Sequence, residues 1–170
     1  LVTLHRPSNV DDPARLDQLV EQLGVLSRDM PVIFPVHPRT RKMLDQQRPG
    51  LQIPGLKVID PLGYIDFLSL ELSAAAVVTD SGGIQEETSF LGVPCLTVRP
   101  NTERPVTVTK GTNRLIDPSA EPLPDAVLRH VEQVRRRPKP GIELWDGHTA
   151  PRVVEALREF LAGAIRKTPV

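Results

Sequence analysis

The sequence is short of cysteine, of net charge and of long apolar runs, and each shortage excludes a class of protein. Its 170 residues contain one cysteine, Cys95, so no disulfide can form within the chain. Lys and Arg number 21, as do Asp and Glu, which leaves no net attraction for nucleic acid or an anionic membrane. No run approaches the roughly 20 apolar residues of a transmembrane helix, and no signal peptide is recognisable. These absences predict a cytoplasmic protein with neither nucleic acid nor membrane as a partner.

Motifs for metal and cofactor chemistry are also missing. The four histidines and Cys95 show no ligand spacing. Neither the dinucleotide fingerprint GxGxxG nor the P-loop GxxxxGK followed by Ser or Thr occurs. We therefore expect no metal site and no cofactor.

Strand-like and helix-like segments alternate from the first residue. This order predicts an α/β fold, with a Rossmann-like parallel sheet covered by helices on both faces. Apolar stretches predict strands at 1–4, 32–36, 56–59, 74–78, 94–98 and 113–116, with Cys95 buried in the strand at 94–98. Helical spacing predicts helices at 13–26, 39–47, 65–73 and 84–91, one along Val127 to Val134 that Pro138 and Pro140 stop, and a last one from about 149. Asp12 is the predicted N-cap of the first helix, with Pro13 at its first position. Residues 99–111 lack periodicity and are expected to form a polar loop.

Two adjacent glycines join a predicted strand to a predicted helix in the run Thr79-Asp80-Ser81-Gly82-Gly83. The first N–H groups of a helix lack partners within it, and the helix dipole adds partial positive charge there. Without a Cβ, Gly82 and Gly83 let an anionic oxygen approach the main chain. Glu87 lies one turn later on the same face, where a ligand hydroxyl would meet it. An ordinary strand-to-helix connection has the same pattern, so the run alone leaves phosphate binding open.

Other candidate residues follow the strands or lie on the next helices. His5 comes directly after the first strand and titrates near neutrality, which suits a group that protonates a leaving phosphate or holds its charge. An isolated histidine more often satisfies a loop, and we favour that structural role for His37. The Arg104 guanidinium suits a phosphate or a base carbonyl, or else pairs with acidic neighbours. Phe67 fits either a helix core or a packing surface for a base.

The motifs form a family pattern when they are taken in order. They are Thr3-Leu4-His5-Arg6, Asp60-Pro61-Leu62 with Tyr64 and Phe67, the run from Thr79 to Glu87, Leu91-Gly92-Val93-Pro94, and Thr102-Glu103-Arg104-Pro105 with Gly111-Thr112. Their order and spacing closely resemble the carboxyl-terminal half of the non-hydrolysing UDP-N-acetylglucosamine 2-epimerases. The similarity continues to Asp146-Gly147, and so covers nearly the whole chain.

The resemblance implies a GT-B architecture, of which this chain supplies one half. Residues 1–148 would be a UDP-binding Rossmann-like domain, and 149–170 a terminal helix that crosses to a missing amino-terminal domain. The reaction implied is interconversion of UDP-N-acetylglucosamine and UDP-N-acetylmannosamine by elimination and re-addition of UDP. The acid and base carboxylates of this family lie in the amino-terminal half, so this half alone should bind ligand without epimerising it. The full-length protein is expected to be a homodimer.

The resemblance also implies a role for each site residue. Ser81, Gly82 and Gly83 would bind the diphosphate, and Arg104 would contact the ligand near the phosphates. Glu87 would bind the ribose hydroxyls, and Phe67 and the Leu62 backbone would bind the uracil. His5 would lie beside the leaving UDP and assist its departure and return.

Three other functions stay open on the sequence. They are the donor-binding half of a GT-B glycosyltransferase, a hydrolysing UDP-N-acetylglucosamine 2-epimerase, and a catalytically silent nucleotide-sugar sensor. The Thr102 to Pro105 segment favours an epimerase over a transferase, and His5 favours an enzyme over a sensor. Pro7-Ser8 stands where many family members have Arg-Glu, so contacts from that loop are expected to differ.

Overall fold

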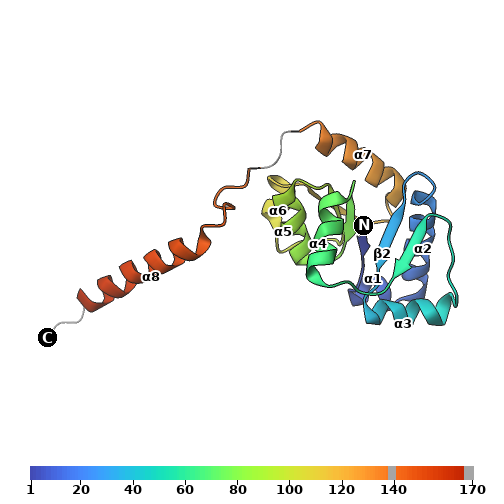
Figure 1. The fold of residues 1–170 in the computed structure, drawn as a ribbon, viewed down its shortest axis with the longest axis horizontal. Coiled ribbons are helices and arrows are strands. Elements are labelled where there is room, and N and C mark those ends of the chain that lie inside the picture. Colours follow the sequence, from blue (N-terminus) through green and yellow to red (C-terminus); the bar gives the residue numbers. More distant parts are fainter. Residues whose placement is uncertain (138–140, 167–170) are drawn as a thin grey trace. The chain divides into compact units, whose positions relative to one another are not determined.

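The computed structural model describes residues 1–137 and 141–166, and the chain divides into two compact units, Leu1–Pro140 and Gly141–Val170. In chain order the first unit contains β1 (Val2–Thr3), α1 (Pro7–Val10), α2 (Pro13–Leu26), β2 (Val32–Pro35), α3 (Pro38–Gln47), β3 (Leu56–Ile59), α4 (Tyr64–Ser73), β4 (Val77–Thr79), α5 (Gly82–Leu91), β5 (Cys95–Val98), α6 (Pro105–Thr109), β6 (Asn113–Ile116) and α7 (Leu123–Arg135) (Figure 1). The second unit contains α8 (Thr149–Arg166). None of the helices in the described ranges is both long and apolar enough to cross a bilayer.

All the strand pairs are parallel, as predicted, but the hydrogen-bonded ladders form two sheets. One has the order β1-β4-β5-β6 and the other pairs β2 with β3. The strand β1 is only two residues long, and the backbone N–H groups of His5 and Arg6, which follow Leu4, donate to the Asp80 carboxylate. The carbonyl of Leu4 accepts from the Thr40 hydroxyl of α3 at 2.6 Å. Side-chain contacts therefore replace a backbone ladder at this point.

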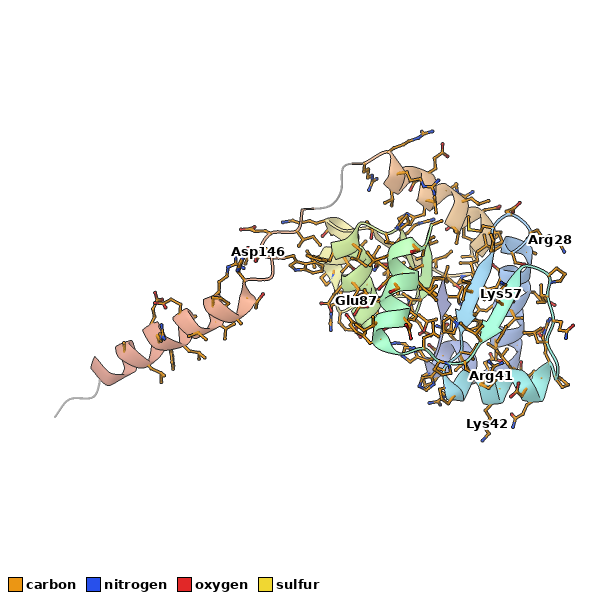
Figure 2. All side chains as sticks on the ribbon, viewed as in Figure 1. Arg28, Arg41, Lys42, Lys57, Glu87 and Asp146 are labelled. Atoms are coloured by element: carbon orange, nitrogen blue, oxygen red, sulfur yellow. The ribbon has the colours of Figure 1, made fainter. Side chains whose placement is uncertain are left out.

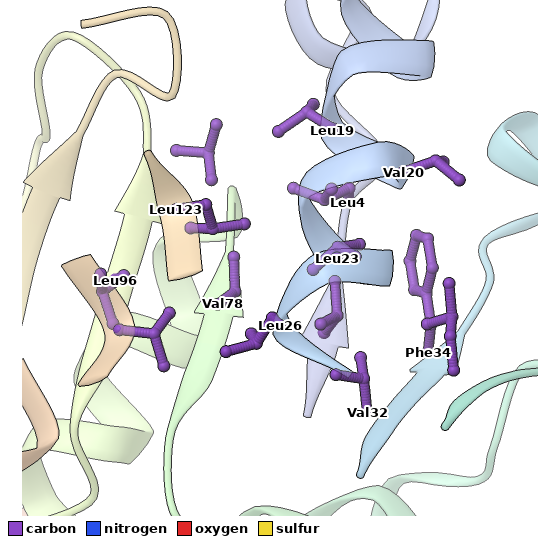
Figure 3. Packing of buried hydrophobic residues seen from close by; sticks show 14 of the residues in the cluster. Leu4, Leu19, Val20, Leu23, Leu26, Val32, Phe34, Val78, Leu96 and Leu123 are labelled. Atoms are coloured by element: carbon purple, nitrogen blue, oxygen red, sulfur yellow. The ribbon is translucent and has the colours of Figure 1, made fainter. Parts of the chain in front are cut away.

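Helices cover both faces of the four-stranded sheet, as the alternation predicts. On one face, α2 and α7 pack on the strands, and Leu19, Leu23 and Leu123 share one core cluster with Val78 and Leu96 (Figure 3). Every one of these side chains is at most 2% exposed. This apolar layer fixes the sheet against the helices, since burial of apolar side chains is the main stabilising contribution to folding.

The opposite face of the sheet is polar and lies under α5 and α6. Thr97 of β5 donates to the Asn113 Oδ1 of β6 at 2.7 Å. The Asn113 amide donates in turn to Gln85 Oε1 of α5 and to the Thr107 hydroxyl of α6, both at 3.1 Å. Cys95 faces this layer fully buried, as predicted, and burial raises the pKa of its thiol to about 12. It is a packing residue at neutral pH.

Several local predictions are confirmed and others need correction. The Asp12 side chain caps α2 by accepting from the Ala14 N–H at 3.0 Å, with Pro13 in the first turn, as predicted. The prediction of a loop throughout 99–111 is wrong, because α6 forms from Pro105. The short helix α1 was also not predicted. Both have fewer than six residues, too few to give a helical period. Pro138 and Pro140, predicted to stop α7, lie outside the described residues.

Candidate functional site

The glycine turn between β4 and α5 presents an open main chain. Ser81 is extended (φ −81°, ψ 139°) and its side chain does not cap the helix, which begins at Gly82. A Cβ added to Gly82 or Gly83 would meet no atom within 4 Å, and neither glycine has a positive φ. Within the described chain, neither packing nor backbone conformation therefore calls for glycine at these positions. Glycine at these positions would instead allow an outside group to approach the first N–H groups of α5 closely.

A buried carboxylate holds His5 beside this turn. Asp80 is fully buried, and its oxygens accept from the backbone N–H groups of His5 (3.1 Å) and Arg6 (2.9 Å) and from the Asn9 amide (3.1 Å). The Nδ1 of His5 lies 3.0 Å from Asp80 Oδ1. Burial alone would raise the pKa of Asp80, but these hydrogen bonds outweigh it, and the net pKa is lowered. The ionised Asp80 fixes the ring by Nδ1, which leaves Nε2 as the nitrogen that can exchange a proton with a ligand.

The helix α4 lies beside α5 and meets Glu87 there (Figures 1 and 2). The Tyr64 hydroxyl donates to Glu87 Oε1 at 3.4 Å. Phe67, three residues after Tyr64 and half-buried, lies on the same side of α4. Leu62 is exposed in the loop that precedes α4. The two residues expected to hold a base therefore belong to the segment that contacts Glu87.

The segment from Thr102 to Arg104 is tied to the glycine turn by Gln85. This side chain is fully buried, donates to the Ser81 carbonyl at 3.1 Å and accepts from the Thr102 hydroxyl at 2.6 Å. The backbone N–H of Arg104 donates to the same hydroxyl at 2.9 Å. The Arg104 guanidinium pairs with Glu86 at 2.9 Å, where both side chains are more than 40% exposed. Arg104 thus forms the ion pair with an acidic neighbour that was the alternative to binding a phosphate or a base.

A second ion pair fixes the start of that segment. The buried Arg99 guanidinium donates to both carboxylate oxygens of Glu103, at 2.9 and 2.7 Å. These hydrogen bonds lower the pKa of Glu103 to about 2, so the pair stays charged at any physiological pH.

His37 has the structural role predicted for it. Its Nδ1 accepts from the Arg39 N–H at 3.2 Å and caps α3. The ring centroid lies 5.7 Å from that of His5.

Two polar residues of the site, Asp80 and Gln85, were not identified as functional from the sequence. The parallel register pairs Thr3 with Thr79, so the residues after each strand, His5 and Asp80, meet at one sheet edge. A carboxylate beside a glycine turn was the available signal for Asp80. Gln85, one turn after Ser81 on the inner side of α5, offered none beyond its spacing.

The pattern of these motifs matches one family over nearly the whole chain. The model of the family described as UDP-N-acetylglucosamine 2-epimerase matches residues 1–158. The chain belongs to the UDP-N-acetylglucosamine 2-epimerase family.

Two of the relatives are 41% and 45% identical to this chain over the matched residues. The UDP-N-acetylglucosamine 2-epimerase of Methanocaldococcus jannaschii is 41% identical over 165 residues, which are 92% of this chain and 43% of the relative. The UDP-2,3-diacetamido-2,3-dideoxy-D-glucuronate 2-epimerase of Pseudomonas aeruginosa is 45% identical over 117 residues, 68% of this chain and 32% of the relative. This chain thus spans less than half the length of either relative.

A solved structure in the family superposes well on this fold. The M. jannaschii epimerase in complex with UDP-GlcNAc and UDP gives a TM-score of 0.78 at 39% identity, over 93% of this chain and 44% of that one. The predicted fold class, a Rossmann-like α/β unit that forms one half of a GT-B architecture, is confirmed by this likeness.

Proposed function

We propose that this chain is the nucleotide-binding half of an epimerase that interconverts UDP-N-acetylglucosamine and UDP-N-acetylmannosamine. The observation that carries the proposal is the open main chain at Gly82 and Gly83, which lies between His5 and Glu87 and for which the described chain offers no internal reason. Membership of the epimerase family and the likeness to a chain solved with UDP-GlcNAc and UDP support the same function.

The site suits a uridine nucleotide in one orientation. The N–H groups of Gly82 and Gly83 would hold the diphosphate, because the start of a helix attracts anions. Ser81 would contribute its hydroxyl, since its backbone N–H already donates to Thr79 Oγ1 at 3.0 Å. Glu87, one turn further along α5, would accept from the ribose hydroxyls. The uracil would lie against Phe67 and the Leu62 backbone, in the segment that Tyr64 joins to Glu87.

Arg104 is available to the diphosphate despite its ion pair. Exposed ion pairs contribute at most about 1 kcal/mol, so the Arg104–Glu86 pair at 2.9 Å is weak competition for a doubly charged ligand. The loop itself would stay in place, since Thr102 and Gln85 hold it.

His5 would serve the step in which UDP departs. A base in the other half takes the proton from C2 of the sugar as the C1–O bond to UDP breaks, which leaves a glycal and UDP. Protonation of C2 on its opposite face and re-addition of the UDP oxygen to C1 then give the epimer. The Nε2 of His5, free while Asp80 holds Nδ1, would protonate the departing phosphate oxygen and take the proton back on its return.

One of the relatives suggests a second candidate sugar for the substrate. The P. aeruginosa relative, at 45% identity, is a 2-epimerase named for a diacetamido glucuronate. The residues described above meet the nucleotide, so an epimerase of either sugar would use them alike.

The remaining partner of this half is an amino-terminal domain. The helix α8 carries Val153, Val154, Leu157, Phe160 and Leu161 at helical spacing, each at least 47% exposed. We propose that this apolar face packs on the amino-terminal domain, that residues 1–148 form the nucleotide-binding domain, and that the full-length protein is a homodimer. Residues 167–170 of the predicted helix lie outside the described residues.

The full-length protein is expected to exchange hydrogen at C2. In deuterated water, UDP-N-acetylglucosamine should gain deuterium at C2 and yield UDP-N-acetylmannosamine, both followed by NMR. UDP-2,3-diacetamido-2,3-dideoxy-D-glucuronate is tested in parallel. Free UDP and sugar as sole products would favour the hydrolysing alternative, and binding without exchange of either sugar would favour a sensor or a transferase half.

Glu87→Ala is expected to weaken UDP binding about 10- to 100-fold, because a hydrogen bond to a charged group contributes roughly 1.5–3 kcal/mol. Isothermal titration calorimetry with UDP measures the effect. Glu132→Ala, on the exposed side of α7, is the matched control and should bind as the wild type does. Equal affinity in Glu87→Ala would remove Glu87 from the site.

A further inference from the structure

A carboxyl group without a partner lies inside α4. Glu71 is fully buried, and neither of its carboxylate oxygens has a hydrogen-bond partner among the described residues. It lies between Leu70 and Leu72 in α4. Burial of an unpaired charge is unfavourable by several kcal/mol. The Glu71 carboxyl is therefore expected to be protonated and neutral. In that form it can donate a hydrogen bond to a nearby acceptor.

The titratable groups that interact with Glu71 among the described residues include an acceptor. They are Glu87 from α5, Tyr64 from α4 and Cys95 from β5. Tyr64 lies seven residues before Glu71, two turns along the same face of α4, and donates to Glu87. Burial first, and then the neighbouring Glu87 carboxylate, raise the pKa of Glu71 to about 7. At or below neutral pH, Glu71 therefore carries a proton that it can donate, and Glu87 is the carboxylate beside it.

We propose that Glu71 is a positioning residue for nucleotide binding, whose protonated carboxyl donates to Glu87 and holds that carboxylate toward the ribose hydroxyls. The inference rests on the proposed function, because it assigns Glu87 to the ribose. Tyr64 and Glu71 then hold the same carboxylate from two turns of one helix.

The hydrogen bond makes nucleotide affinity depend on pH in a defined direction. As the pH rises through about 7, Glu71 loses its proton and becomes a second negative charge near the Glu87 carboxylate. Glu87 loses a donor and gains a repelling neighbour. UDP affinity should therefore fall on the alkaline side. Glutamine at position 71 would keep an N–H donor that does not titrate.

UDP titration calorimetry on the full-length protein, from about pH 6 to about pH 8.5, tests the proposal with Glu71→Gln and Glu71→Leu. The wild type should lose about tenfold in UDP affinity over this range beyond any loss in Glu71→Gln, as expected for one hydrogen bond to a charged group. Glu71→Leu, which has no donor, should bind weakly at both ends. Any change in affinity that comes from titration of UDP itself is the same for Glu71→Gln and the wild type, and so cancels in the comparison. Identical pH profiles in the wild type and Glu71→Gln would overturn the proposal.

A measurement on the wild type covers the case in which these variants do not fold. Carboxyl ¹³C NMR follows the titration of Glu71 with and without UDP. Bound UDP should raise the midpoint, because a ligand that prefers the protonated form must stabilise it. An unchanged midpoint would contradict the proposal. Absence of UDP binding by the wild type would instead refute the proposed function.

Discussion

Asp80→Ala is expected to lower the free energy of unfolding by about 3–5 kcal/mol, the range seen when one partner of a buried charged network is removed. The substitution leaves the backbone N–H groups of His5 and Arg6 and the Asn9 amide without their acceptor. Urea denaturation of the protein measures the loss. Asp117→Ala is the matched control, because Asp117 is 61% exposed and its pair with Arg15 should contribute at most about 1 kcal/mol. A loss of less than 1 kcal/mol at Asp80 would show that these N–H groups find other partners.

The contribution of Asp80 to stability also has a pH signature. The pKa of Asp80 is lower in the folded protein than its ordinary value of 3.8. The stabilisation is therefore fully present above that ordinary value, and is lost as the pH falls through the folded pKa. Acid unfolding of Asp80→Asn should lack this component.

His5→Ala in the full-length protein is expected to lower turnover by about 10²- to 10⁴-fold, the usual contribution of a positioned acid–base group. UDP affinity should be largely kept, because the diphosphate would be held by the N–H groups of the glycine turn. Steady-state kinetics and UDP calorimetry separate the two effects. Unchanged turnover would return His5 to the role of a loop residue that satisfies Asp80.

Local features of the fold could be predicted because each depends on a few neighbouring residues. The cap at Asp12, the burial of Cys95 and the glycine turn are of this kind. The pair of His5 and Asp80 joins residues 75 positions apart, and its formation depends on the register of β1 and β4. That register cannot be derived from either segment by itself.

A residue of the candidate site could be predicted from the sequence where it belongs to a recognisable motif. A residue that acts by holding another side chain could not. Ser81 to Gly83 stand out in the sequence because of their glycines. Gln85 and Glu71 act through side chains on neighbouring elements, and neither has a pattern of its own. In the sequence, Glu71 is one of several polar residues of α4, and its importance depends on α4 lying beside Glu87.

The hydrogen bonds of Gln85 have a kinetic consequence. Through hydrogen bonds within the protein, this side chain fixes the Ser81 carbonyl, the Thr102 hydroxyl and the Asn113 amide in one arrangement. A turn that is ordered in advance need not fold around its ligand, so little conformational entropy is lost in the encounter. Association of UDP with this half should therefore be fast and show a single kinetic phase, with no slow step for loop ordering. Differences in affinity among variants of the turn should then appear mainly in the rate at which UDP leaves.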